Sequence, residues 1–85
     1  MIQYIEFYIT SYNVRTGQVL DQVLTKLQDY GDIKRWDKRP DPDSDTLHYT
    51  VNGSWAAYST ISTILKSKGK TGDPIQFSLE HFEED

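Results

Sequence analysis

The spacing of apolar residues changes along this chain, and this change constrains the fold more than any other feature. Residues 2–9 alternate apolar and polar side chains, which is typical of a strand with one buried face. From residue 17 to residue 30, apolar side chains instead recur every third or fourth position, as on one side of an amphipathic helix. The segment YITSYNVRTGQ, residues 8–18, is therefore predicted to join a strand to a helix.

The same patterns recur in the rest of the chain. They predict strands at 32–39, at 46–52 and from 74 onward, a solvated turn at 40–45 (PDPDSD), and a helix at 55–68. In the second of the four strands, Ile33 and Trp36 have opposite parity, so we expect a bulge or a one-sided edge strand there. Thr16 and Ser54 are candidate caps for the two helices, and Gly31 is suited to end the first.

The resulting order is β-α-β-β-α-β, which predicts an α+β fold of the ferredoxin-like type. Because each β-α-β crossover is right-handed, the expected sheet is antiparallel with strand order 4-1-3-2, and both helices cover one face. We expect residues 1–85 to form a single domain. The predicted core lies between the sheet and the helices. Its side chains are Ile5, Phe7, Ile9, Val19, Leu20, Val23, Leu24, Leu27, Tyr30, Leu47, Tyr49, Val51, Ala57, Tyr58, Ile61, Ile64, Leu65, Ile75, Phe77 and Leu79.

Composition argues against several classes of function. The chain has no cysteine, hence no disulfide and no thiolate metal site, and its two histidines lack metal-ligand spacing. The aspartates of DPDSD resemble a calcium loop, but Thr46 and Asn52 stand where that loop requires glycine and glutamate. We therefore predict no metal, no cofactor and no catalytic residue, which leaves enzyme activity undecided but favours a protein that is not an enzyme.

Charge and hydropathy bear on partners and location. A net charge of −4 argues against binding nucleic acid by bulk charge. No segment is long and apolar enough for a membrane span, and the N-terminus does not resemble a signal peptide, so we expect a cytoplasmic protein with no membrane partner.

If both helices cover one face of the sheet, the other face is bare. Strand parity predicts that this face carries Tyr4, Glu6 and Tyr8, then Thr46, His48 and Thr50, then Lys34, Trp36 and Lys38, then Gln76, Ser78, Glu80 and Phe82. Aromatic enrichment favours a protein partner or a homo-oligomer contacting Tyr4, Tyr8, Trp36, His48, Lys34 and Lys38. The alternatives are a purely solvated sheet and a nucleic-acid surface, on which bases stack on aromatic side chains beside basic ones.

The loop after the first strand is a second candidate site. It precedes a helix N-terminus, where backbone N–H groups bind anions, and Asn13, Arg15, Thr16 and Gly17 are suited to line a small-molecule pocket. The alternative is purely structural: Asn13 favours the turn, Thr16 caps the helix and Gly17 relieves crowding.

Two family resemblances concern this segment. VRTGQVLDQVLTKLQDYGDI, residues 14–33, resembles the opening of ACT-type regulatory domains, with Gly17 and Gly31 at their two glycines, and this implies an effector-binding regulatory domain. SYNVRTGQ, residues 11–18, is similar to the strand exit of the small CRISPR-adaptation nucleases and their toxin–antitoxin relatives. That resemblance places Asn13 where the family has its metal-binding aspartate. An amide is a poor ligand for a hard cation, so it implies a relative without nuclease activity.

Overall fold

The computed structural model describes residues 3–69 and 77–82. Its elements are β1 (Tyr4–Ser11), α1 (Val14–Asp29), β2 (Ile33–Pro40), β3 (Leu47–Ser54), α2 (Trp55–Gly69) and β4 (Phe77–Phe82). This order confirms the predicted β-α-β-β-α-β pattern. The expected strand start at Pro74, with Ile75 and Gln76, lies outside the described residues.

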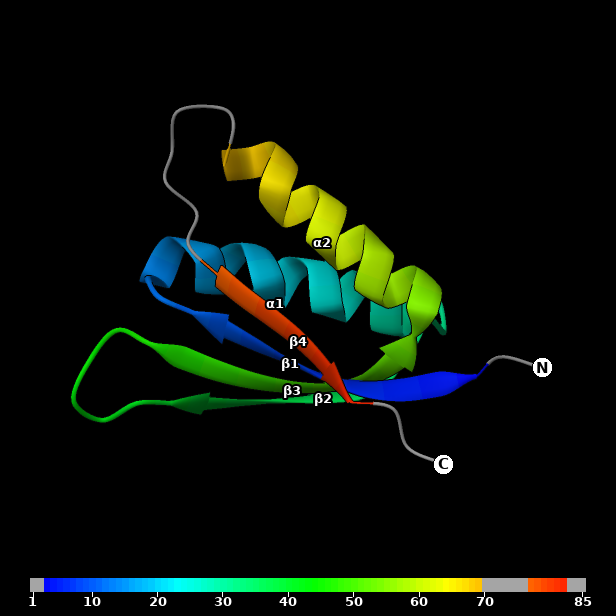
Figure 1. Ribbon diagram of the computed structural model, residues 1–85, viewed down its shortest axis with the longest axis horizontal. Coiled ribbons are helices and arrows are strands. Elements are labelled where there is room, and N and C mark those ends of the chain that lie inside the picture. The colour runs from blue at the N-terminus through cyan, green and yellow to red at the C-terminus, as the bar shows by residue number, and fades with distance from the viewer. Residues whose placement is uncertain (1–2, 70–76, 83–85) are drawn as a thin grey trace.

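The four strands form one antiparallel sheet of order β2-β3-β1-β4, which is the predicted 4-1-3-2 order read from the opposite edge. Figure 1 shows both helices on the same side of this sheet, with the other side uncovered by either of them. The chain therefore has the ferredoxin-like α+β fold.

The core fills the space between the sheet and the two helices. On β1, the side chains of Ile5, Phe7 and Ile9 are at most 1% exposed, while Tyr8 between them is 40% exposed. This difference confirms the predicted facing of β1. The other buried members of the core are Leu20, Leu24, Ile33, Tyr49, Val51, Ala57, Ile61 and Leu65.

Tyr30 departs from the predicted core, because its side chain is 72% exposed. The helix ends one residue earlier, and Tyr30 is its C-cap. The N–H of Gly31 donates to the carbonyl of Gln28 at 3.1 Å, and the N–H of Asp32 donates to that of Leu27 at 3.0 Å. These two bonds form a Schellman motif, which requires the left-handed conformation that Gly31 adopts at φ 85°.

The N-terminus of α1 corrects the prediction, since the helix starts at Val14 rather than Gly17. Asn13 is the N-cap: its Oδ1 accepts the backbone N–H of Thr16 at 2.8 Å and the hydroxyl of Thr16 at 3.0 Å. Thr16 therefore lies inside the first turn, fully buried, and is not the cap. Asparagine caps a helix as well as threonine does, so the first turn forms three residues earlier than periodicity alone indicated.

The second helix starts as predicted. Ser54 caps it, with its hydroxyl oxygen accepting the N–H of Ala57 at 3.1 Å. The backbone N–H of Ser54 also donates to the carbonyl of Asp32 at 2.8 Å, which fixes the start of α2 beside the end of α1. Among the residues described, neither helix is sufficiently long and apolar to span a membrane.

We predict that replacing Gly31 by alanine lowers the free energy of unfolding by about 1–2 kcal/mol, because the left-handed conformation is unfavourable for a residue with a Cβ. The cause is conformational, since a Cβ at this position would meet nothing within 4 Å. Urea unfolding measures the change. Gly31→Asn is the matched control and should lose clearly less, because asparagine tolerates this conformation; equal losses in the two variants would contradict the assignment.

Candidate interaction surface

The sheet face opposite the helices carries aromatic, polar and charged side chains. Residues paired across antiparallel strands point to the same side, so the strand register fixes which residues share this open face. From β4 towards β2, its described side chains form three rows: Glu6, Asn52 and Arg35; Glu80, Tyr8, Thr50 and Asp37; and Ser78, Thr10, His48 and Arg39. The predicted positions of Tyr8 and His48 on this face are confirmed by the register.

A β-bulge in β2 corrects the predicted position of Trp36 and Lys38. Between Ile33 and Arg35 the pairing with β3 shifts, so Trp36 pairs with Val51 and Lys38 with Tyr49. Both partners are core residues, so Trp36 and Lys38 lie on the helix side of the sheet and not on the open face. The expected bulge exists, and one extra residue was enough to reverse the facing of every later side chain in β2.

The same shift brings two arginines to the open face that the sequence pattern had not placed there. Arg35 is paired with Asn52, and Arg39 with His48. Arg39 contacts Asp37 at 3.6 Å, with both side chains largely exposed, so this ion pair contributes little to stability. The sequence carries a signal for this position of the two arginines, namely the opposite parity of Ile33 and Trp36. If both of these residues face the core, a bulge must lie between them, and Arg35 and Arg39 then face the open side.

Tyr4 and Lys34 lie together at one end of this surface. The Tyr4 hydroxyl donates to the carbonyl of Gly31 at 3.1 Å. The Nζ of Lys34 lies 6.0 Å from the centre of the Tyr4 ring, at the outer limit of a cation–π contact. This end of the open face is thus fixed to the loop that follows α1.

Lys38 instead belongs to a polar cluster beneath α1, made by Asp21, Lys38 and Tyr49. Asp21 Oδ2 lies 2.9 Å from the Nζ of Lys38, and Asp21 Oδ1 accepts the Tyr49 hydroxyl at 2.8 Å. Trp36 packs beside Tyr49, with ring centres 6.1 Å apart. One carboxylate of the helix therefore binds to side chains of both β2 and β3.

Tyr49 is a buried phenol whose acidity is changed by this environment. Burial raises the pKa of Tyr49 well above its ordinary value, and the hydrogen bond and negative charge of Asp21 raise the pKa further. The hydroxyl is therefore held in its neutral, proton-donating form. The cluster consequently holds α1 on the sheet and offers no activated nucleophile.

The predicted ligand loop is occupied by contacts within the fold. Asn13 and Thr16 are bonded to each other, and Ser11 donates to the Asn13 carbonyl at 2.8 Å. Gly17 marks a close approach of helix and sheet, because a Cβ there would lie 2.5 Å from Leu47 Cδ1. Arg15 is exposed on the first turn of α1. These contacts explain Asn13, Thr16 and Gly17 structurally, and a ligand at this loop stays a prediction.

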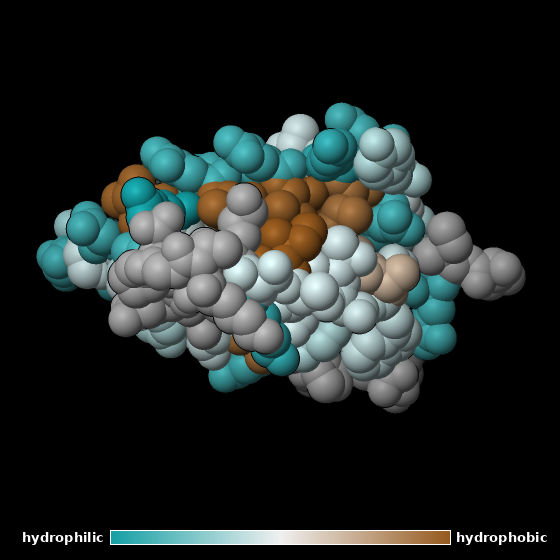
Figure 2. Space-filling model, turned by 90° about the horizontal axis from the view of Figure 1, so that it is seen from above, coloured by the Kyte–Doolittle hydropathy of each residue, from teal (hydrophilic) through white to brown (hydrophobic). Residues whose placement is uncertain are grey.

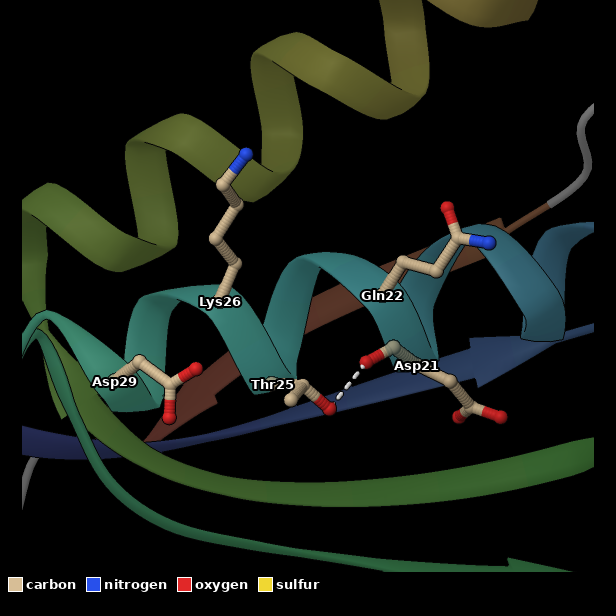
Figure 3. A pocket seen from close by; sticks show the side chains of 5 residues that line it. All are labelled: Asp21, Gln22, Thr25, Lys26 and Asp29. Carbon is tan, nitrogen blue, oxygen red and sulfur yellow. Dashed lines mark hydrogen bonds between the residues drawn. The ribbon is translucent and has the colours of Figure 1, made fainter.

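The helix side of the molecule has hollows, two of which are lined by residues of α1. Figure 3 shows the first, on the outer surface of α1, where the carboxylate of Asp21 points towards the sheet while Lys26 extends towards α2. Because these side chains diverge, they present no common binding geometry. The second is an apolar groove between the helices, lined by Val23, Lys26, Leu27, Tyr30, Thr60 and Ile64. It forms part of the hydrophobic strip visible between the helices in Figure 2.

Titratable side chains do not gather elsewhere in the described residues in the way a metal site requires. No three histidine, aspartate or glutamate side chains there lie close enough together to hold an ion. The carboxylates of the turn after β2 are used locally; for example, Asp41 accepts the N–H of Asp43 at 2.9 Å. The open face of the sheet is therefore the strongest candidate surface.

Comparison with known proteins supports the fold. No family model matches the sequence, and no curated protein matches it. Among solved structures, the chain is similar to the uncharacterized protein TM1266 from Thermotoga maritima, with 9% identity and a TM-score of 0.57, over 95% of this chain and 100% of the other. At that identity the likeness shows the fold alone.

We predict that the stability of the chain depends on pH through Tyr49. Its folded pKa is raised above its unfolded value of about 10, so the stabilisation is complete below pH 10 and is lost as pH rises further. Urea unfolding at pH of about 9 and 11 should therefore show a larger loss of stability in the wild type than in Tyr49→Phe.

At neutral pH, Tyr49→Phe should itself lose about 1–2 kcal/mol, because it removes a hydrogen bond to a carboxylate. Lys38→Met is the companion variant. It keeps the aliphatic stem and should lose less than about 1 kcal/mol, since the ion pair is partly exposed. Identical pH profiles in the wild type and Tyr49→Phe would contradict the role of the phenol.

Proposed function

We propose that this chain is a small non-catalytic binding module that acts by contacting another protein through the open face of its sheet. The observation that carries the proposal is that neither helix covers this face, although it presents Tyr8, 40% exposed, at its centre. Thr10, Thr50 and Glu6 flank Tyr8, and the other charged side chains of the face lie on the outer strands. An aromatic centre with a polar rim is the usual composition of a protein interface.

The face is favoured over the edge strand β2, which is protected against pairing with another strand. β2 contains the bulge at Ile33 and Arg35, exposed charges along its length, and Pro40 at its end. Bulges, lysines and prolines are devices by which natural sheets prevent edge-to-edge association. Addition of a partner strand at β2 would have to overcome all three.

A binding role is also favoured by how the titratable groups are used. Asp21, Lys38 and Tyr49 form a converging set, but they are bonded to one another and join α1 to the sheet. The open face, in contrast, carries dispersed charges suited to orienting a partner. We therefore place the activity on the face and not in a pocket.

The proposal predicts that Tyr8→Glu disrupts binding. Immobilised wild-type chain should retain a specific protein from a lysate of its source organism, and calorimetry with that purified protein should show Kd raised at least about tenfold by Tyr8→Glu, because the variant places a charge at the centre of the contact. Thr25→Glu, on the outer surface of α1, is the matched control and should leave Kd within about twofold.

The two variants must share the unfolding curve of the wild type within about 1 kcal/mol, since both positions are exposed. A partner that binds wild type and Tyr8→Glu equally well would refute the open face as the binding surface. So would a partner lost on Thr25→Glu alone.

A nucleic-acid role is the second candidate, and the corrected register of β2 favours it. Arg35 and Arg39 share the open face with Tyr8 and His48, which combines cations with rings on which bases stack. Glu6 and Glu80 on the same face oppose it, as does the net charge of −4. We therefore rank it second.

This candidate predicts weak, salt-dependent binding of single-stranded oligonucleotides. Fluorescence anisotropy should show binding that falls steeply with salt and is lost in Arg35→Ala/Arg39→Ala, because each arginine neutralises a phosphate. Lys38→Ala is the control, since Lys38 contacts Asp21 on the helix side. If no labelled DNA or RNA binds at about 20 mM salt, this candidate is excluded.

A further inference from the structure

We propose that the partner on the open face is a second copy of this chain, packed face to face about a two-fold axis that runs along the strands. The inference rests on the proposed function and names its partner. The observation behind it is the distribution of charge across the sheet, from one edge strand to the other.

Charge on the open face changes sign from β4 to β2. The β4 side carries Glu80 and, on the neighbouring β1, Glu6. The β2 edge carries Arg35 and Arg39, with Lys34 near Tyr4 at its end, against the single carboxylate of Asp37. The middle strand β3, next to β2, presents only neutral threonine and asparagine side chains and one histidine on this face. The face is therefore acidic at one edge and basic at the other.

This gradient selects one symmetric way to stack two copies. A two-fold axis parallel to the strands places β2 of one copy over β4 of the other, and β3 over β1, so the edge with net positive charge in each copy faces the acidic edge of the other. An in-plane axis perpendicular to the strands places β2 over β2 and β4 over β4, so like charges meet.

The centre of the contact is complementary in shape and polarity under this symmetry. Tyr8 and Thr50 are register partners on the two middle strands. The axis therefore brings Tyr8 of each copy over Thr50 of the other, placing a large side chain against a small one twice. The most exposed aromatic ring described on the face is thereby covered.

At the edges, the arginines supply the cations and Glu80 the anion. Asp37 shares the row of Glu80 and lies opposite it under this symmetry, but Asp37 is one carboxylate against two arginines on the open face of β2. Arg35 and Arg39 flank Asp37 at two-residue spacing on the same face, within reach of a carboxylate opposite them. Each edge therefore has a net attraction that salt weakens.

Exchange of the charges tests this contact. The test compares the wild type with a β2 variant, Arg35→Glu/Arg39→Glu, and with a β4 variant, Ser78→Lys/Glu80→Lys. Sedimentation equilibrium at about 5 to 500 µM protein and low salt would measure the dimer Kd of each. The wild type should dimerise, and each variant alone should show Kd raised at least about tenfold because both its edges carry one sign. An equimolar mixture should recover a heterodimer, since each acidic edge then meets a basic one.

Cysteine cross-linking tests the direction of the axis, and the chain has no native cysteine to interfere. Arg39 and Ser78 occupy the same row on opposite edges of the face. The reagent is a short bismaleimide whose length matches the distance of about 10 Å between packed sheets. A mixture of Arg39→Cys and Ser78→Cys should give a covalent heterodimer, while Arg39→Cys alone should not cross-link. Cross-linking of Arg39→Cys with itself would overturn the proposed axis.

The result also separates this inference from the proposed function. A wild type that remains monomeric throughout the concentration range, with no heterodimer in the mixture, overturns the second copy as partner. If a different protein is then bound by the wild type and lost on Tyr8→Glu, the binding role of the face still holds. Dimerisation that is unaffected by both charge-reversal variants places the contact elsewhere and contradicts the inference as well.

Discussion

One extra residue in β2 determines what both faces of this sheet carry. Before the shift between Ile33 and Arg35, the side chain of Ile33 enters the core; after it, Trp36 does so. Because side chains alternate along a strand, two core residues three positions apart are compatible only with a bulge. The bulge thus sends Trp36 and Lys38 towards α1 and leaves Arg35 and Arg39 on the opposite side.

The polar cluster beneath α1 depends on that shift. Asp21 lies beside the buried stripe of α1, with its carboxylate directed towards the sheet and its side chain 36% exposed. Lys38 reaches it from β2 and the Tyr49 hydroxyl reaches it from β3, so one carboxylate has a cation and a proton donor. Without the bulge, Lys38 would point away from the helix. The charge balance of the open face and the anchoring of α1 therefore share one cause.

The sequence predicted the element order, the strand order and the inward face of β1, because these follow from strong periodicity and from the handedness of crossovers. It was less informative where two signals competed. Asn13 and Thr16 are both good caps, and only the buried first turn shows that Asn13 has this role. In β2, the conflicting parity of Ile33 and Trp36 indicated a bulge or a one-sided edge strand without distinguishing them, so Trp36 and Lys38 were assigned to the wrong face. Tyr30 continues the apolar stripe of α1, yet the Schellman motif at Gly31 ends the helix before its ring can pack.

A contact across the open face would be reversible, because folding does not depend on it. The buried side chains of both middle strands, including Phe7 and Val51, lie on the helix side, where they already form one core with α1 and α2. The open face contributes mostly polar and charged groups, whose attraction across an interface determines orientation and salt dependence more than affinity. An obligate interface, in contrast, resembles a hydrophobic core divided between two chains. The distribution of apolar residues in this chain thus favours a monomer that folds alone and associates on its polar side.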